Sequence, residues 1–389
     1  MNAVPPGANF EIGPIQKARS ECRRRLRRIR RITDQEPSAR RTQLLDRDCH
    51  AYVRSPFARR AILSSLPQFH RWDNERLRQL VNDLDPQTRC TTDVQWRAER
   101  KSMGRERYVC ILPAQAHLGQ ILAKDLVTAQ LRPDARVFDW PGRGRLHYAN
   151  ALAQAIERHG PFVATMDIIS CHQCVDPDAL YRLNLLPAEL VHWSIDHRNL
   201  SFRRVDECRS NQSSSLSVKP TGPRGLLQGG PASSALLTAL IGHSVTELRQ
   251  AYCQSYSDNF AVVGRDSAGV QQAAGELTRI VAGYRVGRLE FHPFEVIDAR
   301  DGFQQLGFDF KLVTGRVRIA PNTGNTLRIL RRIEECIITA ENDDLALGRA
   351  AFIEKEMAAY RVVSDIYFRD IEDAVDQIWR DEVERRLSL

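Results

Sequence analysis

Two short apolar runs, each meeting an acidic residue, constrain the fold of this chain more than any other feature. The run at residues 163–166 (VATM) ends in Asp167, and Asp258 lies in the polar turn Ser257-Asp258-Asn259, between the runs AYCQSY and FAVVGR. Two short runs around a polar turn predict a β-hairpin. If the strand that ends at Asp167 pairs with this hairpin, both carboxylates lie at one end of one antiparallel sheet.

Apolar residues at helical spacing predict helices before, between and after these strands. Residues 17–33 carry Leu26, Ile29 and Ile32 at a spacing of three, and residues 34–100 are polar and helical in pattern. Further helices are predicted at AHLGQILAKDLVTAQL, LHYANALAQAIERHG, ASSALLTALIGHSVTELRQ and residues 325–389, and further strands at RYVCILP, GFQQLGFDFKL and GRVRIAP. An antiparallel sheet with many helices indicates the α+β class.

The two acids are suited to metal-dependent phosphoryl chemistry. Nucleotidyl transfer uses carboxylates that bridge two Mg²⁺ ions about 4 Å apart. Because Mg²⁺ keeps waters and substrate phosphates as its other ligands, few protein acids suffice. Between the acids, a loop at residues 225–231 enters a helix at Ala232 or Ser233, and its glycines let the backbone approach a ligand closely. Each acid alone is equally typical of a turn or a helix cap.

Arginine dominates the charge of the chain. There are 56 basic and 48 acidic residues, a net charge of +8, and 50 of the basic residues are arginine. Residues 331–389 carry a net charge of −6, which leaves +14 on residues 1–330. A flat guanidinium suits phosphate, so this distribution predicts a polyanionic partner.

The densest basic segment is residues 23–31. Its arginines are Arg23, Arg24, Arg25, Arg27, Arg28, Arg30 and Arg31. So much like charge without acidic partners favours nucleic-acid contact. The alternative is a solvated helix with a narrow apolar stripe.

Residues 100–320 carry, in this order, the motifs RYVCILP, ARVFDWPGRGRLHYANA, MDIISCHQCV, GLLQGGPASSALLTAL, Tyr256-Ser257-Asp258-Asn259 and GFQQLGFDFK. In order and spacing, these motifs resemble those of a bacterial reverse transcriptase of the group II intron-like kind. MDIISCHQCV resembles the first palm acid motif of that family, and GLLQGGPASSALLTAL resembles its Gln-Gly-Gly…Ser loop and helix. Tyr256-Ser257-Asp258-Asn259 resembles its Tyr-x-Asp-Asp hairpin, and GFQQLGFDFK resembles its primer-grip hairpin. RYVCILP and ARVFDWPGRGRLHYANA resemble its fingers motifs.

The resemblance implies a right-hand polymerase fold with fingers, a palm built on an antiparallel sheet, and a helical thumb. It assigns residues 1–50 to a basic N-terminal extension, 51–160 to the fingers, 161–312 to the palm, and 313–389 to the thumb or C-terminal segment. The implied activity is RNA-directed DNA polymerisation, a nucleotidyl transfer that needs Mg²⁺ or Mn²⁺ and converts dNTPs into a DNA copy of an RNA template. Stand-alone relatives include retron and phage-defence enzymes, which implies antiviral defence and a dedicated noncoding RNA as template. A second protein subunit or a second copy of the chain is a further partner to consider.

Residue by residue, the resemblance assigns catalysis to Asp167, Asp258 and Asn259. It assigns metal binding to Asp167, Asp258 and the backbone carbonyl of Ile168. The residues that match nucleotide-binding positions are Arg105, Arg107, Arg143, His172, Gln228 and Gly229, with Lys101 as a further candidate. Leu306 and Gly307 match the primer grip.

Several positions depart from the family pattern. Asn259 replaces the second acid of the hairpin and removes one negative charge, and His172 replaces the aromatic residue that normally blocks the ribose 2′-hydroxyl. The lysine expected in LEFHPFEV, a proposed acid for the leaving pyrophosphate, falls on Phe294 or Glu295. Two alternatives follow: a weakened RNA-binding subunit that scaffolds an active partner, and a template-independent nucleotidyltransferase.

The sequence also predicts a cytoplasmic protein without a membrane partner. No apolar stretch is long enough to span a bilayer. The start of the chain, MNAVPPGANFEIG, lacks the basic-then-apolar order of a signal peptide.

Overall fold

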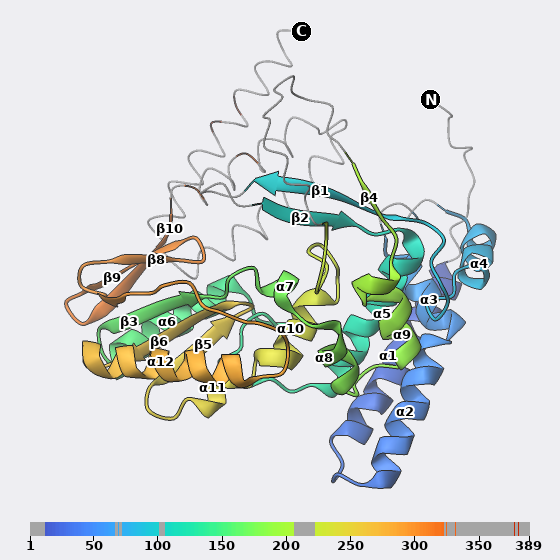
Figure 1. The fold of residues 1–389 in the computed structure, drawn as a ribbon. Coiled ribbons are helices and arrows are strands. Elements are labelled where there is room, and N and C mark those ends of the chain that lie inside the picture. Colours follow the sequence, from blue (N-terminus) through green and yellow to red (C-terminus); the bar gives the residue numbers. More distant parts are fainter. Residues whose placement is uncertain are drawn as a thin grey trace. The chain divides into compact units, whose positions relative to one another are not determined.

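The computed structural model describes residues 12–66, 69, 72–100, 106–205 and 222–322, with residues 324, 331, 377 and 380 (Figure 1). Arg105, Lys101 and most of the helical segment predicted at 325–389 lie outside the described residues. Within the described part, no helix is long and apolar enough to cross a membrane.

The chain divides into two compact units, and each unit takes three separate segments of sequence. Unit 1 comprises Met1–Pro133, Ile169–His243 and Ala282–Glu290. Unit 2 comprises Asp134–Ile168, Ser244–Val281 and Phe291–Leu389. Helices and strands occur in both, so the predicted α+β class is confirmed.

Unit 1 is mostly helical. Its helices are α1 (Ile12–Thr33), α2 (Ala39–Val53), α3 (Pro56–Leu63), α4 (Asn74–Asp83), α5 (Ala114–Gln130), α7 (Cys171–Cys174), α8 (Pro177–Arg182), α9 (Ala188–Ser194), the 3₁₀ helix η3 (His197–Asn199) and α10 (Ser233–Ile241). Its strands are β1 (Val94–Arg100), β2 (Glu106–Ile111) and β4 (Phe202–Arg204).

Unit 2 contains most of the strands. These are β3 (Phe162–Asp167), β5 (Tyr252–Tyr256), β6 (Asn259–Gly264), β7 (Val296–Asp298), β8 (Phe303–Gln305), β9 (Phe308–Val313) and β10 (Arg316–Pro321). Its helices are α6 (Arg145–His159), α11 (Ser244–Glu247) and α12 (Ser267–Gly283), the last of which ends two residues beyond the segment boundary.

Helix α1 is amphipathic, as its apolar spacing predicts. It buries Ala18, Cys22, Ile29 and Ile32 along one face, which packs against α2, α3 and α5. Spacings of four, seven and three keep these residues on the same side of an α-helix. The opposite side of α1 carries the arginines, and α1 and α2 lie side by side in Figure 1.

The small sheet of unit 1 has the strand order β2-β1-β4. Strand β1 corrects the prediction that residues 34–100 are helical throughout. The segment VQWRAER alternates apolar and polar residues, and this period of two places Val94 and Trp96 against Cys110 and Leu227 in one buried cluster. The alternation over these seven residues makes them a strand, although the residues before them are helical in pattern.

The larger sheet of unit 2 has the strand order β5-β6-β3-β7, and β3 is antiparallel to both of its neighbours. Strands β5 and β6 form the predicted hairpin. The predicted pairing of the hairpin with the strand that ends at Asp167 is also confirmed, because β3 pairs with β6 along its whole length. This central position buries Val163, Ala164 and Met166.

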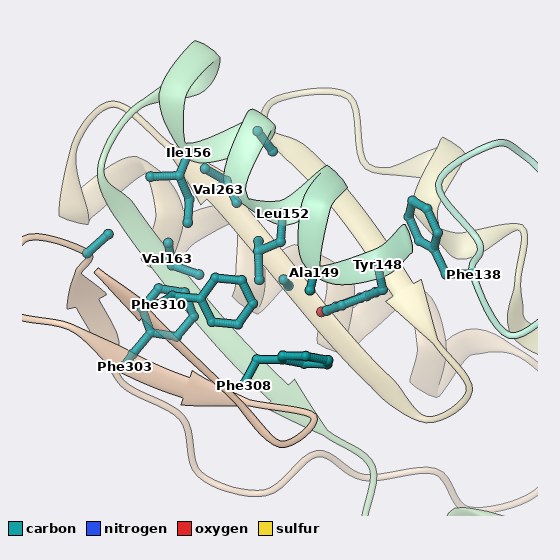
Figure 2. Packing of buried hydrophobic residues seen from close by; sticks show 13 residues of the cluster. Phe138, Tyr148, Ala149, Leu152, Ile156, Val163, Val263, Phe303, Phe308 and Phe310 are labelled. Atoms are coloured by element: carbon teal, nitrogen blue, oxygen red, sulfur yellow. The ribbon is translucent and has the colours of Figure 1, made fainter. Parts of the chain in front are cut away.

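Helix α6 and a second sheet, of order β10-β9-β8, form the core of unit 2 around the larger sheet. Figure 2 shows Leu152 and Ile156 of α6 on the side of Phe303 and Phe310, and Tyr148 of the same helix on the side of Phe138. The two phenylalanine rings are stacked with centroids 5.0 Å apart. Burial of these large side chains fixes the hairpin β8–β9 on the same unit as the two acids.

Candidate functional site

The two predicted acids lie together at one end of the larger sheet of unit 2. In the β3–β6 register, Asp167 is directly opposite Asn259. The next residue along, Ile168, donates its backbone N–H to the backbone oxygen of Asp258 at 3.2 Å. Asp167 and Asn259 therefore form a non-hydrogen-bonded pair, whose side chains lie on the same face of the sheet.

Asp258 occupies a two-residue hairpin loop. Tyr256 pairs with Asn259, so only Ser257 and Asp258 lie between the strands. Ser257 has a positive φ of 56°, which suits the strand twist of a tight hairpin. The Asn259 amide Nδ2 donates to Asp258 Oδ1 at 3.1 Å. The amide that replaces the second acid of the motif therefore hydrogen-bonds to the first.

His292 also lies at this end of the sheet, and sequence reasoning missed it. Its Nε2 is 3.9 Å from Asp167 Oδ2, and its backbone N–H donates to the Asp167 backbone oxygen at 2.9 Å. The side chain of Asp167 is half exposed. The lysine of the family pattern is missing from this segment, because its position falls on Phe294 or Glu295. The pairing of Ile168 with Phe291 instead brings His292 beside the acid.

The oxygen atoms at this sheet end fit a hard divalent cation. Carboxylates and backbone carbonyls are the ligands that Mg²⁺ and Mn²⁺ prefer. In an extended strand the N–H and C=O of one residue point to the same side. Because the Ile168 N–H points to Asp258, the Ile168 carbonyl is directed to that side as well. Among the described residues, no cluster of three or more His, Cys, Asp and Glu side chains is placed to hold a metal ion. The fit therefore rests on two carboxylates and this carbonyl.

The glycine-rich loop belongs to unit 1, where it runs beside β2. Gln228 forms a parallel bridge with Val109, and its backbone oxygen accepts from the Cys110 N–H at 2.8 Å. Gly229 has a φ of +94°, and a Cβ there would lie 2.8 Å from the Cys110 carbonyl oxygen. The side-chain oxygen of Gln228 is buried, and no donor within the described ranges reaches it. Gln228 Oε1 is therefore a buried acceptor that no described donor satisfies.

The loop is also fixed to the start of α10. Ser233 Oγ and the Gly230 N–H both donate to the Leu227 backbone oxygen, at 2.7 and 3.0 Å. The Leu227 side chain is buried in the cluster beneath β1 and β2. These contacts place the predicted helix start at Ser233.

Two of the predicted nucleotide-binding arginines are described. Arg107 is exposed on β2, on the face away from the buried Cys110. Arg143 belongs to unit 2, where its Nη1 donates to the backbone oxygens of Asp134 and Val137 at 2.5 and 2.6 Å. One nitrogen of the Arg143 guanidinium therefore stabilises the loop that begins at Asp134.

His172 belongs to unit 1 and lies within the short helix α7. Its backbone oxygen accepts from the Leu226 N–H at 2.7 Å, which joins α7 to the glycine-rich loop. The structure therefore brings His172, Gln228 and Gly229 together in one part of unit 1.

The predicted primer-grip residues form the turn between β8 and β9. Leu306 and Gly307 both have positive φ, 51° and 85°. The Leu306 side chain packs on the core of unit 2, and the Gly307 backbone oxygen accepts from Asn322 N–H at 2.9 Å. GFQQLGFDFKL is therefore a hairpin of two strands rather than one strand.

The seven arginines of residues 23–31 are not equivalent. Glu21 binds Arg24 at 2.7 Å and Arg25 at 3.0 Å, and Asp48 of α2 binds Arg28 at 2.6 Å. The remaining arginines of α1 are exposed and form no ion pair within the described part of the chain: Arg19, Arg23, Arg27, Arg30 and Arg31. Positions 19, 23 and 27 recur once per turn, about 6 Å apart along the axis.

Comparison with known proteins finds no matching family model and no matching curated protein. Two solved structures are similar to this chain in part. One is an insertion-loop deletion mutant of the RNA-dependent RNA polymerase of a human picobirnavirus, with 12% identity, a TM-score of 0.35, and coverage of 75% of this chain and 62% of that chain. The other is telomerase from Candida albicans in complex with a fragment of telomeric RNA, with 12% identity, a TM-score of 0.36, and coverage of 74% and 61%. The chain thus spans less than two thirds of either structure.

Proposed function

We propose that this chain is a nucleic-acid polymerase that transfers nucleotides at Asp167 and Asp258. One observation carries the proposal: the β3–β6 register sets Asp167 opposite Asn259, with Asp258 in the adjoining turn. Two carboxylates at one end of one sheet, one at the end of β3 and one in the neighbouring turn, suit phosphoryl transfer with divalent metals.

In the proposed reaction, a strand's 3′-oxygen forms a bond to the α-phosphorus of a nucleoside triphosphate. The bond from that phosphorus to the β-phosphate oxygen breaks, pyrophosphate leaves, and the hydroxyl proton passes to solvent. Asp167, Asp258 and the Ile168 carbonyl would hold Mg²⁺ or Mn²⁺. When bound, the metal stabilises charge on the attacking and leaving oxygens. We propose that Gln228 and Gly229 line the position of the nucleotide and that the exposed Arg107 neutralises phosphate charge.

We further propose that the polymerase copies RNA into DNA, as the motif order implies. The assignments of fingers, palm and thumb, the primer grip at Leu306 and Gly307, and a role in antiviral defence belong to this finer proposal. A scaffold function is the second candidate, and one contact favours it. The Asn259 amide uses a hydrogen-bonding site on Asp258, and an amide supplies no charge to a cation.

The test is incorporation of labelled dNTPs and NTPs by the purified full chain with Mg²⁺ or Mn²⁺. Three conditions are compared: RNA template with primer, co-purifying RNA, and no template. Asp167→Asn and Asp258→Ala should each lower incorporation by about 10²–10³-fold, because each removes charge stabilisation at the reacting phosphate. Asp301→Asn is the matched control, since this acid is exposed in the same unit and its N–H closes a turn after β7.

Loss of incorporation in Asp167→Asn and Asp258→Ala, with incorporation retained in Asp301→Asn, would support the polymerase proposal. Dependence on the template would distinguish copying from untemplated addition. Equal activity in Asp258→Ala and the parent would refute the proposed site. Absence of incorporation in every condition, with RNA binding retained, would favour the scaffold.

We propose that the unpaired side of α1 binds the nucleic-acid backbone. Each phosphate contact releases counterions, so the logarithm of affinity falls with the logarithm of salt concentration by about 0.7 per contact for a single strand. Replacing Arg23, Arg27 and Arg31 together by Gln should reduce that slope by about 2. The matched control replaces Arg24, Arg25 and Arg28, which already bind carboxylates. An equal change in the two triple variants would contradict the assignment to this side.

A further inference from the structure

A histidine side chain holds the entrance of the glycine-rich loop in unit 1. The Gly225 N–H donates to His197 Nδ1 at 3.2 Å. The next amide, Leu226 N–H, donates to the His172 backbone oxygen at 2.7 Å. A backbone N–H is always a donor, so Nδ1 must present its lone pair and the ring proton must lie on Nε2. His197 can therefore bind the loop only in its neutral form.

The ring of His197 stands on a rigid support. Asp196, which is buried, accepts from the Arg198 backbone N–H and from Arg198 Nε, both at 3.0 Å. Its other oxygen accepts from the Tyr181 hydroxyl at 3.1 Å. These bonds cap η3 and join it to α8. They hold the backbone of His197 in place without any contribution from the loop.

The loop has no free space at this point. Gly225 has a φ of +65°, and a Cβ there would lie 2.1 Å from the His172 oxygen and 2.9 Å from the Gln173 backbone carbon. The backbone is thus held between α7 and η3. Three residues later the same loop reaches Gln228, whose backbone oxygen is bound by Cys110.

We propose that His197 is a positioning residue, which fixes residues 225–230 in the conformation that presents Gln228 to the incoming nucleotide and releases them when its ring is protonated. This inference rests on the proposed function for the role of Gln228. The contact between His197 and the loop does not depend on it.

The charges around His197 favour the neutral ring. Burial lowers the pKa of His197, and Arg198 and Arg224 lower it further, whereas Asp196 raises it. The adjoining helices contribute two more titratable groups, His192 of α9, whose Nδ1 is 3.0 Å from Asn199 Nδ2, and His172 of α7. Because the pKa is below the ordinary value of about 6.5, the contact is complete above that pH and is lost as pH falls.

The test compares replacements that keep or remove the acceptor. Asn places its Oδ1 where Nδ1 stands and does not titrate, so His197→Asn should retain the bond to Gly225 at every pH. His197→Ala removes the acceptor. Hydrogen exchange of the peptide spanning residues 222–230 in the full chain reports the loop without any need for activity. His117→Asn is the matched control, because burial also lowers the pKa of His117 on α5 but no hydrogen bond joins its side chain to the loop in the described residues.

At pH 7.5 the parent, His197→Asn and His117→Asn should exchange equally, and His197→Ala should exchange about tenfold faster for a lost hydrogen bond of about 1.4 kcal/mol. In a titration downward from pH 7.5, the parent and His117→Asn should begin to exchange faster than His197→Asn at a pH below 6.5. Nucleotide incorporation should follow the same order, with KM raised more than kcat is lowered. Equal exchange in the parent and His197→Asn throughout the acid range in which the protein stays folded would overturn the proposal, and so would fast exchange in His197→Asn at pH 7.5. If exchange follows the prediction and no variant incorporates nucleotide, the positioning role stands and the polymerase proposal fails.

Discussion

Replacing Gly225 by Ala tests whether backbone contact fixes the glycine-rich loop. The φ of +65° costs a residue with a β-carbon about 1–2 kcal/mol. Alanine also lowers the conformational entropy of the unfolded chain, which offsets this cost by about 0.4–1 kcal/mol. The new Cβ would lie 2.1 Å from the His172 oxygen, so backbone must move, which adds about 1–3 kcal/mol. The expected destabilisation of unit 1 is therefore about 1–5 kcal/mol.

Gly315→Ala provides the matched control in unit 2. Gly315 has a φ of +80°, and nothing in the described part of the chain lies within 4 Å of its ideal Cβ. Only the conformational cost remains there, which predicts about 1 kcal/mol.

The assay is hydrogen exchange under conditions where only global opening exposes the amides. Peptides of α5 report unit 1, and peptides of α6 report unit 2. The difference between the two variants isolates the contact with His172. A difference below about 1 kcal/mol would refute the reasoning, because the strain of overpacking would then be absent.

Three further predictions follow from individual contacts. Tyr52→Phe removes the hydroxyl that donates to Oδ2 of the partly buried Asp125 at 2.6 Å, and it should destabilise the protein by about 1–3 kcal/mol in urea unfolding at pH 7.5. Burial raises the pKa of Asp125 and the Tyr52 bond lowers it, so the pKa of Asp125 rises further in the variant and the stability deficit should shrink as pH falls. Asn259→Asp places a second carboxylate beside Asp258, which should lower the melting temperature without metal and increase the rise in melting temperature on adding Mg²⁺; equal shifts in parent and variant would contradict a cation site there. Phe310→Ala should cost about 3–5 kcal/mol in urea unfolding, since Phe310 is 1% exposed in the core of unit 2.

The pairing of the two acids could be predicted from sequence because local signals specify it. An apolar run that ends in Asp167 and a polar turn around Asp258 define two strand ends, and burial of Val163 and Met166 on opposite faces of the strand is typical of a central strand with a neighbour on each side. His292 could not be predicted in the same way. It reaches Asp167 through a bridge between residues 168 and 291, which are more than a hundred positions apart.

The arginines show a similar limit. The apolar spacing of residues 17–33 predicts helix α1, but the partner of Arg28 is Asp48 on α2, so tertiary packing decides which guanidinium groups remain unpaired. Arg143 was predicted to contact a triphosphate, and its Nη1 donates to two carbonyls of its own loop. Sequence gives the charge of such a side chain, and only the folded loop shows where its donors are used.

The interleaving of the two units has a consequence for synthesis on the ribosome. Unit 1 needs residues up to Glu290, and unit 2 begins at Asp134, so neither is complete when half of the chain has emerged. Helices α1 to α5 leave the ribosome early, yet α9 and α10, which pack on α5, follow much later. Strand β3 likewise emerges almost a hundred residues before its partner β6. The apolar face of β3 must therefore stay unpaired for about 5–20 s at the usual rate of translation, which makes the nascent chain a natural client for chaperones.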